Sequence, residues 1–210
     1  MLAFDRWLPD DARDGLPVLI LLHGRGSHRG DLQALRPHLP PGWALVTPQG
    51  PHPGLPWGYG PGWAWYRYVE EDRVDGTTLE QSLGALSAFV QDLPTHLGVE
   101  PGRIALGGFS QGGTTSLAWA LRNGGDAAVL NFSGFLVDSP VVPVDGPSVK
   151  GARIFWGHGR RDPAIPFTLA EKGRQRLREG GALLDARDYE IGHWIAPEEI
   201  EDAMAFLSAT

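Results

Sequence analysis

The feature that most constrains the fold of this chain is the alternation of short apolar runs with longer segments of helical period. Residues 18–22 (VLILL) form one continuous apolar run, as expected for a strand buried on both faces of a parallel sheet. Similar runs predict further strands at 43–47, 103–107, 127–131, 153–156 and 183–189. Helices are predicted between them, at 31–39, 79–97, 111–122, 167–179 and 197–207.

Strands that alternate with helices in this way are typical of βαβ units. The predicted fold class is therefore α/β, with a mainly parallel central sheet and helices on both of its faces. No internal repeat or linker divides the 210 residues, so we expect a single domain over residues 1–210. A chain of this length can bury roughly 70% of its unfolded surface. A single domain of 210 residues leaves no room for a large inserted cap domain.

Residues 48–68 show no helical or strand period. Glycine and proline alternate there with six aromatic residues, namely Trp57, Tyr59, Trp63, Trp65, Tyr66 and Tyr68. A long irregular segment inside a compact domain is usually functional or disordered. Because so many aromatic rings would be costly to leave in water, we expect an ordered loop.

Composition excludes several classes of function. The formal net charge is -7 and no Lys/Arg cluster interrupts it, so nucleic acid is a poor candidate for a partner. The chain has no cysteine, which excludes disulfides, thiolate zinc sites and a cysteine nucleophile. No leader-like segment or membrane-length apolar stretch is found, so a cytoplasmic protein without stable membrane insertion is expected. No metal or cofactor is predicted, and the sequence is compatible with a homodimer.

In sheets of this kind ligands bind outside the carboxyl ends of the strands. Ser110 follows the strand predicted at 103–107 and stands in residues 108–112 (GFSQG), directly before a predicted helix. G-x-S-x-G between a strand and a helix is the nucleophile elbow, a strained turn that exposes the serine hydroxyl. A Cβ on either glycine would clash in so tight a turn. The plainer interpretation is a glycine-rich turn with a serine N-cap.

A serine nucleophile in such folds is followed along the chain by an acid and then by a histidine. His193 lies after the last predicted strand and is the candidate base. His158 directly follows a strand on the segment expected to supply the acid, so it is interpreted as a structural histidine. Asp162 lies just past the strand at 153–156 and is the candidate acid. The rival carboxylates, in a proline-rich segment or within the last strand, are Asp138, Asp145, Asp185 and Asp188.

Ester chemistry also needs an oxyanion hole of two backbone N–H groups. One candidate is the N–H of Gln111, at the start of a helix where the dipole favours an anion. The other is the N–H of Arg25, in the loop after the strand at 18–22. His23 is interpreted as a residue that supports this loop.

With these residues assigned, the chain resembles the phospholipase/carboxylesterase family of α/β-hydrolases, which includes bacterial carboxylesterases and acyl-protein thioesterases. The matching segments are 21–24 (LLHG), 107–113 (GGFSQGG), 158–166 (HGRRDPAIP), and 192–193 (GH) followed by 197–199 (PEE). The resemblance implies an α/β-hydrolase fold, with Ser110 as nucleophile, Asp162 as acid, His193 as base, and Arg25 and Gln111 as oxyanion donors. The chain departs from the family pattern in its long loop. Members of the family often have a Trp-aromatic-Asp step there, whereas this chain has Arg67 after Trp65 and Tyr66.

The predicted function is hydrolysis of small-molecule carboxylic esters or thioesters, with short to medium acyl chains, through an acyl-enzyme on Ser110. Because the aromatic loop should line the substrate pocket, Trp63, Trp65 and Tyr66 are the candidate substrate-binding residues. Alternatives are a dienelactone-hydrolase-like or peptidase activity on the same fold, and a non-catalytic binding protein.

Overall fold

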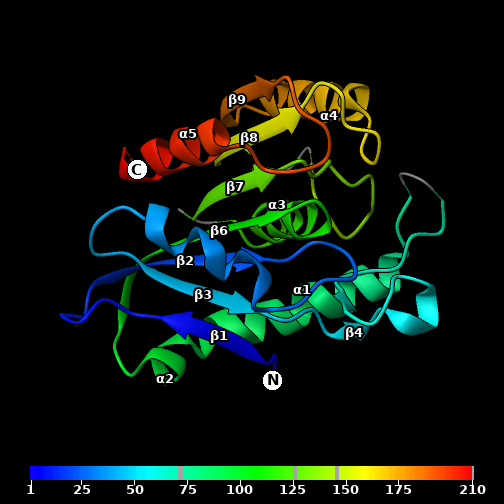
Figure 1. Cartoon of the computed structure of the whole chain (residues 1–210). Helices are drawn as coiled ribbons and strands as arrows, with labels where there is room; N and C mark the ends of the chain where they lie inside the picture. The colour runs from blue at the N-terminus through cyan, green and yellow to red at the C-terminus, as the bar shows by residue number, and fades with distance from the viewer. Residues whose placement is uncertain (71–72, 125–126, 145–146, 210) are drawn as a thin grey trace.

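The computed structural model describes residues 1–70, 73–124, 127–144 and 147–209. A seven-stranded sheet runs through it in the order β1-β3-β2-β6-β7-β8-β9 (Figure 1). β1 pairs antiparallel with β3, and the other neighbouring pairs run parallel. The predicted α/β class with a mainly parallel sheet is therefore confirmed. The strands are β1 (Phe4–Trp7), β2 (Leu16–Leu22), β3 (Ala44–Pro48), β6 (Pro101–Phe109), β7 (Ala128–Phe132), β8 (Arg153–Gly159) and β9 (Leu183–Tyr189).

Helices cover both faces of this sheet because side chains alternate between the faces along each strand. In β2, Val18 and Ile20 belong to the core under helices α1 to α4, whereas Leu19 and Leu21 belong to the core under η1 and α5. These four side chains are fully buried, and burial of each contributes about 1.5–3 kcal/mol. The helices are α1 (Gly76–Gln91), α2 (Leu93–Leu97), α3 (Gln111–Asn123), α4 (Phe167–Glu179), α5 (Pro197–Ser208) and the 3-10 helix η1 (Asp31–His38).

The helix predicted at 79–97 is divided into α1 and α2. Asp75 is the N-cap of α1 and accepts hydrogen bonds from the backbone N–H groups of Thr77 at 2.9 Å and Thr78 at 3.4 Å. The cap of α1 is therefore this aspartate. The segment predicted as a helix at 31–39 is a 3-10 helix, with Pro37 inside it.

The aromatic segment 48–68 is ordered, as predicted. It contains β4 (His52–Pro53), the 3-10 turn η2 (Leu55–Trp57) and β5 (Trp63–Ala64), with β4 and β5 paired. Its backbone also pairs with the loop after β2, because Gly26 donates to the Trp63 carbonyl at 2.8 Å and Trp63 donates to the Ser27 carbonyl at 2.7 Å. A Cβ on Gly62 would lie 2.0 Å from the Gly26 oxygen, so glycine permits this contact.

Candidate active site

Ser110 occupies the sharp turn between β6 and α3. Its backbone has a φ of 54° and a ψ of -115°, a conformation that costs a residue with a Cβ roughly 1–3 kcal/mol. The turn is held by the Ser110 N–H, which donates to the Phe132 carbonyl at 2.7 Å. A Cβ on Gly108 or Gly112 would lie 2.5 or 2.0 Å from the Leu22 oxygen. The steric need for both glycines is thus as predicted.

His193 lies between Ser110 and Asp162. Its Nε2 is 2.9 Å from Ser110 Oγ, and its Nδ1 is 2.6 Å from Asp162 Oδ2. The three residues follow β6, β9 and β8, whose carboxyl ends lie at one edge of the sheet. The carboxylate requires a proton on Nδ1, which leaves the Nε2 lone pair of the neutral ring free to accept the Ser110 hydroxyl. A hydroxyl in this position can lose its proton while it attacks a carbonyl carbon.

The carboxylate of Asp162 is fixed at its other oxygen as well. Its side chain is fully buried, and Oδ1 accepts hydrogen bonds from the N–H groups of Ala164 at 2.8 Å and Ile165 at 2.9 Å. Burial alone raises the pKa of this carboxyl, but the hydrogen bonds from His193, Ile165 and Ala164 outweigh it, so the pKa lies below its ordinary value. An ionised Asp162 can stabilise a protonated imidazole.

His158 supports the segment that carries Asp162. Its ring is fully buried, Nε2 lies 2.9 Å from the Ile165 carbonyl oxygen, and burial lowers its pKa. Because that carbonyl can only accept, Nε2 carries the ring proton. The structural interpretation of His158 agrees with these contacts.

The rival carboxylates are engaged elsewhere. Asp138 lies 3.6 Å from Arg176, and Asp185 lies 2.7 Å from Arg187. Asp188 pairs with Arg160 and Arg174. Asp145 lies outside the described residues.

The two backbone N–H groups predicted to form the oxyanion hole are those of Gln111 and Arg25. Gln111 is the first residue of α3, so its N–H has no acceptor within the helix. Arg25 lies in the loop after β2, and this loop starts next to the elbow because Leu22 pairs with Gly108. In the hydrogen-bond network of the described residues, neither N–H has an acceptor. Both N–H groups are therefore free to donate a hydrogen bond, and their role as oxyanion donors stays a prediction.

The side chain of Gln111 has a role that the sequence pattern did not reveal. It is fully buried, its Oε1 accepts from the Trp65 N–H at 2.8 Å, and its Nε2 donates to the Tyr66 carbonyl at 2.8 Å. The side-chain amide of Gln111 thus hydrogen-bonds to the backbone of the aromatic loop as a neighbouring strand would. The Trp65 indole donates to the His23 carbonyl at 3.0 Å, and Ser82 Oγ donates to the Trp65 carbonyl.

His23 also connects the loops, as its predicted supporting role requires. Its Nε2 accepts from the Gly50 N–H at 2.9 Å, so Nδ1 carries the proton and donates to the Gly24 carbonyl at 2.7 Å. Burial lowers the pKa of His23 to about 4. The ring is therefore neutral around pH 7 and ties the start of the aromatic loop to the loop after β2.

A cavity of about 240 Å³ adjoins Ser110 and His193. Its walls include Arg25, Ser27, Asp31, Tyr68, Phe109 and Ile165. The Phe109 ring packs against the His193 ring with centroids 4.7 Å apart. Phe109 is the second residue of the G-x-S-x-G motif, so its place next to the nucleophile could have been inferred from the sequence.

The predicted substrate-binding residues do not line this cavity. Trp65 and Tyr66 are fully buried, and their backbone groups make the hydrogen bonds to Gln111. Trp63 is half-buried, and its backbone pairs with Ser27. From the aromatic loop it is Tyr68 that reaches the cavity. The structure thus places the rings of Trp65 and Tyr66 in the core, and their role in substrate binding stays a prediction.

Within the described ranges, no cluster of three or more His, Asp or Glu side chains could hold a metal ion. None of the helices in those ranges is long and apolar enough to cross a membrane.

Comparison with protein families matches residues 11–210 to a family described as phospholipase/carboxylesterase. Among curated proteins, acyl-protein thioesterase 1 of Saccharomyces cerevisiae is 30% identical over 160 residues, which cover 69% of this chain and 67% of the yeast protein. Its counterpart in Kluyveromyces lactis is 27% identical over 208 residues and covers 91% and 90% of the two chains.

Solved structures show the same similarity. The crystal structure of esterase PE8 is 28% identical, with a TM-score of 0.85 over 99% of this chain and 98% of that chain. The carboxylesterase from Mesorhizobium loti is 22% identical with a TM-score of 0.78, covers 98% and 99% of the two chains, and supports the fold.

Proposed function

The chain belongs to the phospholipase/carboxylesterase family, and on this basis we propose that it is a serine esterase or thioesterase in which Ser110, His193 and Asp162 form the catalytic triad. The observation that carries the proposal is the pair of hydrogen bonds made by His193, 2.9 Å to Ser110 Oγ and 2.6 Å to Asp162 Oδ2. Ester and thioester substrates are supported by the names of the relatives, acyl-protein thioesterase and esterase.

In the proposed reaction Ser110 Oγ attacks the carbonyl carbon while His193 Nε2 takes the hydroxyl proton. The carbonyl oxygen becomes negative and accepts hydrogen bonds from the N–H groups of Gln111 and Arg25. His193 then gives its proton to the leaving alcohol or thiol, and the acyl group stays on Ser110. Water repeats the same steps, with His193 as the base, and releases the acid.

We further propose short to medium acyl chains as substrates, with Tyr68 and Phe109 as contacting side chains. The cavity at Ser110 is about 240 Å³ in volume and opens to the surface without an inserted cap. Rates measured over a series of ester chain lengths test this. A strong preference for long-chain lipids would contradict it.

The proposed nucleophile is tested with a fluorophosphonate probe and 4-nitrophenyl butyrate. The wild-type protein should be labelled at Ser110 and should hydrolyse the ester, and Ser110→Ala should do neither. Ser208→Ala, on the exposed end of α5, is the matched control and should behave as wild type. The proposal fails if wild type is inert toward both reagents, or if Ser110→Ala keeps full activity.

A further inference from the structure

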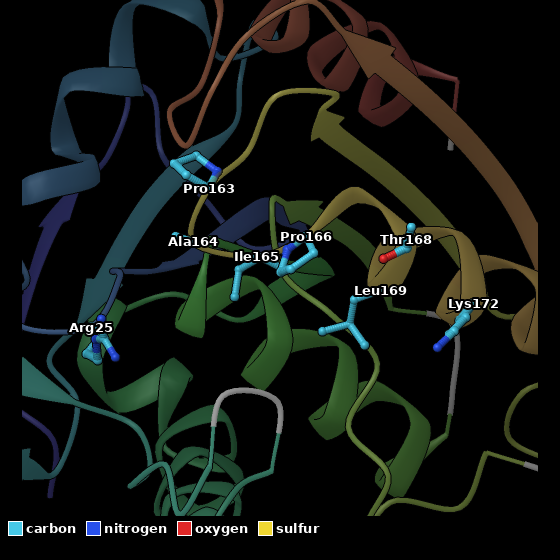
Figure 2. Close-up of a pocket in the computed structure, with 8 residues that line it drawn as sticks. All are labelled: Arg25, Pro163, Ala164, Ile165, Pro166, Thr168, Leu169 and Lys172. Atoms are coloured by element: carbon cyan, nitrogen blue, oxygen red, sulfur yellow. The ribbon is translucent and has the colours of Figure 1, made fainter.

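Figure 2 shows the residues that line a second cavity, of about 420 Å³. Arg25, Ala164 and Ile165 line both cavities, so a molecule bound at Ser110 can extend past these residues into the second one. Apolar side chains form the middle of the second cavity, among them Pro163, Ile165, Pro166 and Leu169.

The charged side chains that line this second cavity, within the described part of the chain, are both cations. They are Arg25 and Lys172, and they stand at opposite ends of the row of apolar residues (Figure 2). This contrasts with the net charge of -7 of the whole chain. A local pair of cations on an acidic protein attracts anions to one place.

Within the described residues, aromatic rings and no carboxylate hold Arg25 in position. Its guanidinium lies 4.9 Å from the centroid of the Tyr59 ring and 5.4 Å from that of the Tyr68 ring. Two such contacts fix the planar group and leave its edge N–H donors free. Among the ion pairs of the described residues, none involves Arg25. The side chain is thus prepared to bind an external anion.

Lys172 lies on α4, and the start of that helix faces the same cavity. Thr168 and Leu169, in the first turn of α4, line the cavity. The first turn has no acidic residue, and no side chain caps it. The partial positive charge of the helix N-terminus therefore adds to the two side-chain cations.

The neighbouring cavities are less suited to an anion. Asp31 lines the cavity at Ser110, where it accepts a hydrogen bond from Ser27 at 2.6 Å. Glu70 lines a third cavity next to Arg25 and pairs with Arg73 at 2.8 Å. Like-charge repulsion from these carboxylates disfavours an anion there.

We infer that the second cavity binds an anionic group of the substrate, and that the preferred substrates are esters or thioesters that carry a carboxylate beyond a short apolar chain. The apolar side chains of the cavity contact the chain. Arg25 binds the carboxylate, and Lys172, at the opposite end of the apolar row, adds to the positive potential that attracts it. This inference rests on the proposed function, since it places the scissile carbonyl at Ser110.

The test compares matched substrates that differ only in charge. In one arm the acid part carries the anion, with monoethyl adipate against its neutral monoamide. In the other arm the alcohol part carries it, with the acetate ester of 4-hydroxybutanoate against its amide. The readout is the ratio of kcat/KM for the anionic ester to kcat/KM for the neutral one, so a general loss of activity in a variant cancels. A preference in either arm supports the inference, and the arm tells which side of the scissile bond enters the cavity.

Arg25→Gln should lower this ratio about tenfold, because it removes a charge-assisted hydrogen bond while it keeps the backbone N–H. Lys172→Gln should lower it about two- to fivefold, as for an exposed charge pair. Added salt should also reduce the ratio in the wild type. Two controls each remove a nearby positive charge that already has a partner. Arg29 lies in the same loop as Arg25 and pairs with Asp5 at 3.0 Å. Arg176 lies one turn after Lys172 and pairs with Asp138 at 3.6 Å. Neither Arg29→Gln nor Arg176→Gln should change the ratio.

An equal rate for charged and neutral esters in both arms would overturn the inference and leave the proposed function intact. A preference that survives both Arg25→Gln and Lys172→Gln would overturn it in the same way. If the wild type hydrolyses no ester and Ser110 is not labelled, the proposed function fails and the inference falls with it.

Discussion

The side-chain oxygen of Gln111 accepts a hydrogen bond from the backbone N–H of Trp65 at 2.8 Å. The residue that follows the proposed nucleophile thereby fixes the aromatic loop, and its Nε2 extends the contact to the Tyr66 carbonyl. Gln111→Met keeps the length of the side chain but leaves both backbone groups buried without partners. We expect a loss of about 2–5 kcal/mol in the free energy of unfolding, measured in urea. Gln175→Met, on the exposed face of α4, should change it little, and an equal loss in both variants would contradict this role.

Asp162→Asn tests the acid. The amide keeps an acceptor for Ala164 and Ile165, so the fold should be retained, but it no longer holds the imidazole in the required tautomer or offsets its charge. We expect kcat to fall about 10⁴-fold with little change in melting temperature. Asp138→Asn, which alters an exposed rival carboxylate, should keep wild-type kcat. Comparable losses in the two variants would rule out the assignment.

His23 should make the protein sensitive to mild acid. Its folded-state pKa of about 4 lies below the ordinary 6.5. Between pH 4 and pH 6.5 the unfolded chain therefore binds a proton at this residue that the folded chain does not bind. Stability from this group is fully present above pH 6.5 and is lost as the pH falls towards 4, by up to about 3 kcal/mol. Urea unfolding of His23→Gln should show a shallower loss over this window. His38→Gln, at an exposed histidine, should follow the wild type.

Glu199 should have the opposite dependence on pH. It is fully buried, its Oε2 accepts from the Ala196 N–H at 3.3 Å, and burial raises its pKa to about 8. Between pH 4.5 and 8 the folded chain keeps a proton that the unfolded chain releases, so stability falls as the pH rises through this window. Glu199→Gln should therefore melt at a higher temperature than wild type at pH 9 and at a similar one at pH 5. A gain of the same size in the exposed Glu198→Gln would show that Glu199 is not the cause.

The same substitution at two glycines should have opposite effects. A Cβ on Gly112 would lie 2.0 Å from the Leu22 oxygen and 2.7 Å from the His23 oxygen, so Gly112→Ala must displace the elbow. We expect it to lose stability and activity together. Gly84 lies within α1, where an added Cβ would meet no neighbouring group within 4 Å, so Gly84→Ala should gain about 0.5–1 kcal/mol from helix propensity. Thermal unfolding and butyrate hydrolysis of the two variants would check both expectations.

Most of the sheet could be predicted because its inner strands are buried on both faces, as in β2, and such strands appear in the sequence as unbroken apolar runs. β1 was not predicted because it has no such apolar run. It is a four-residue edge strand in which Asp5 and Arg6 interrupt the apolar pattern.

Of the three polar residues assigned from strand ends and chain order, His193 is within hydrogen-bond distance of both Ser110 and Asp162. The directions of Trp65 and Tyr66 could not be predicted in this way. They depend on hydrogen bonds with Gln111, His23 and Ser82, which are 17 to 46 residues away in sequence. No local pattern in residues 48–68 distinguishes an aromatic ring that packs inward from one that faces the cavity.

The aromatic loop has two kinds of ring, the buried Trp65 and Tyr66 and the less buried Tyr59 and Tyr68. This difference has a consequence for directed evolution of this enzyme. Trp65 and Tyr66 are tied to the nucleophile turn and will tolerate little randomisation. Tyr59 and Tyr68 carry the guanidinium of Arg25 and have their rings outside that buried set. Libraries that vary these two tyrosines should therefore alter selectivity at a lower cost in folded yield than libraries that vary Trp65 and Tyr66.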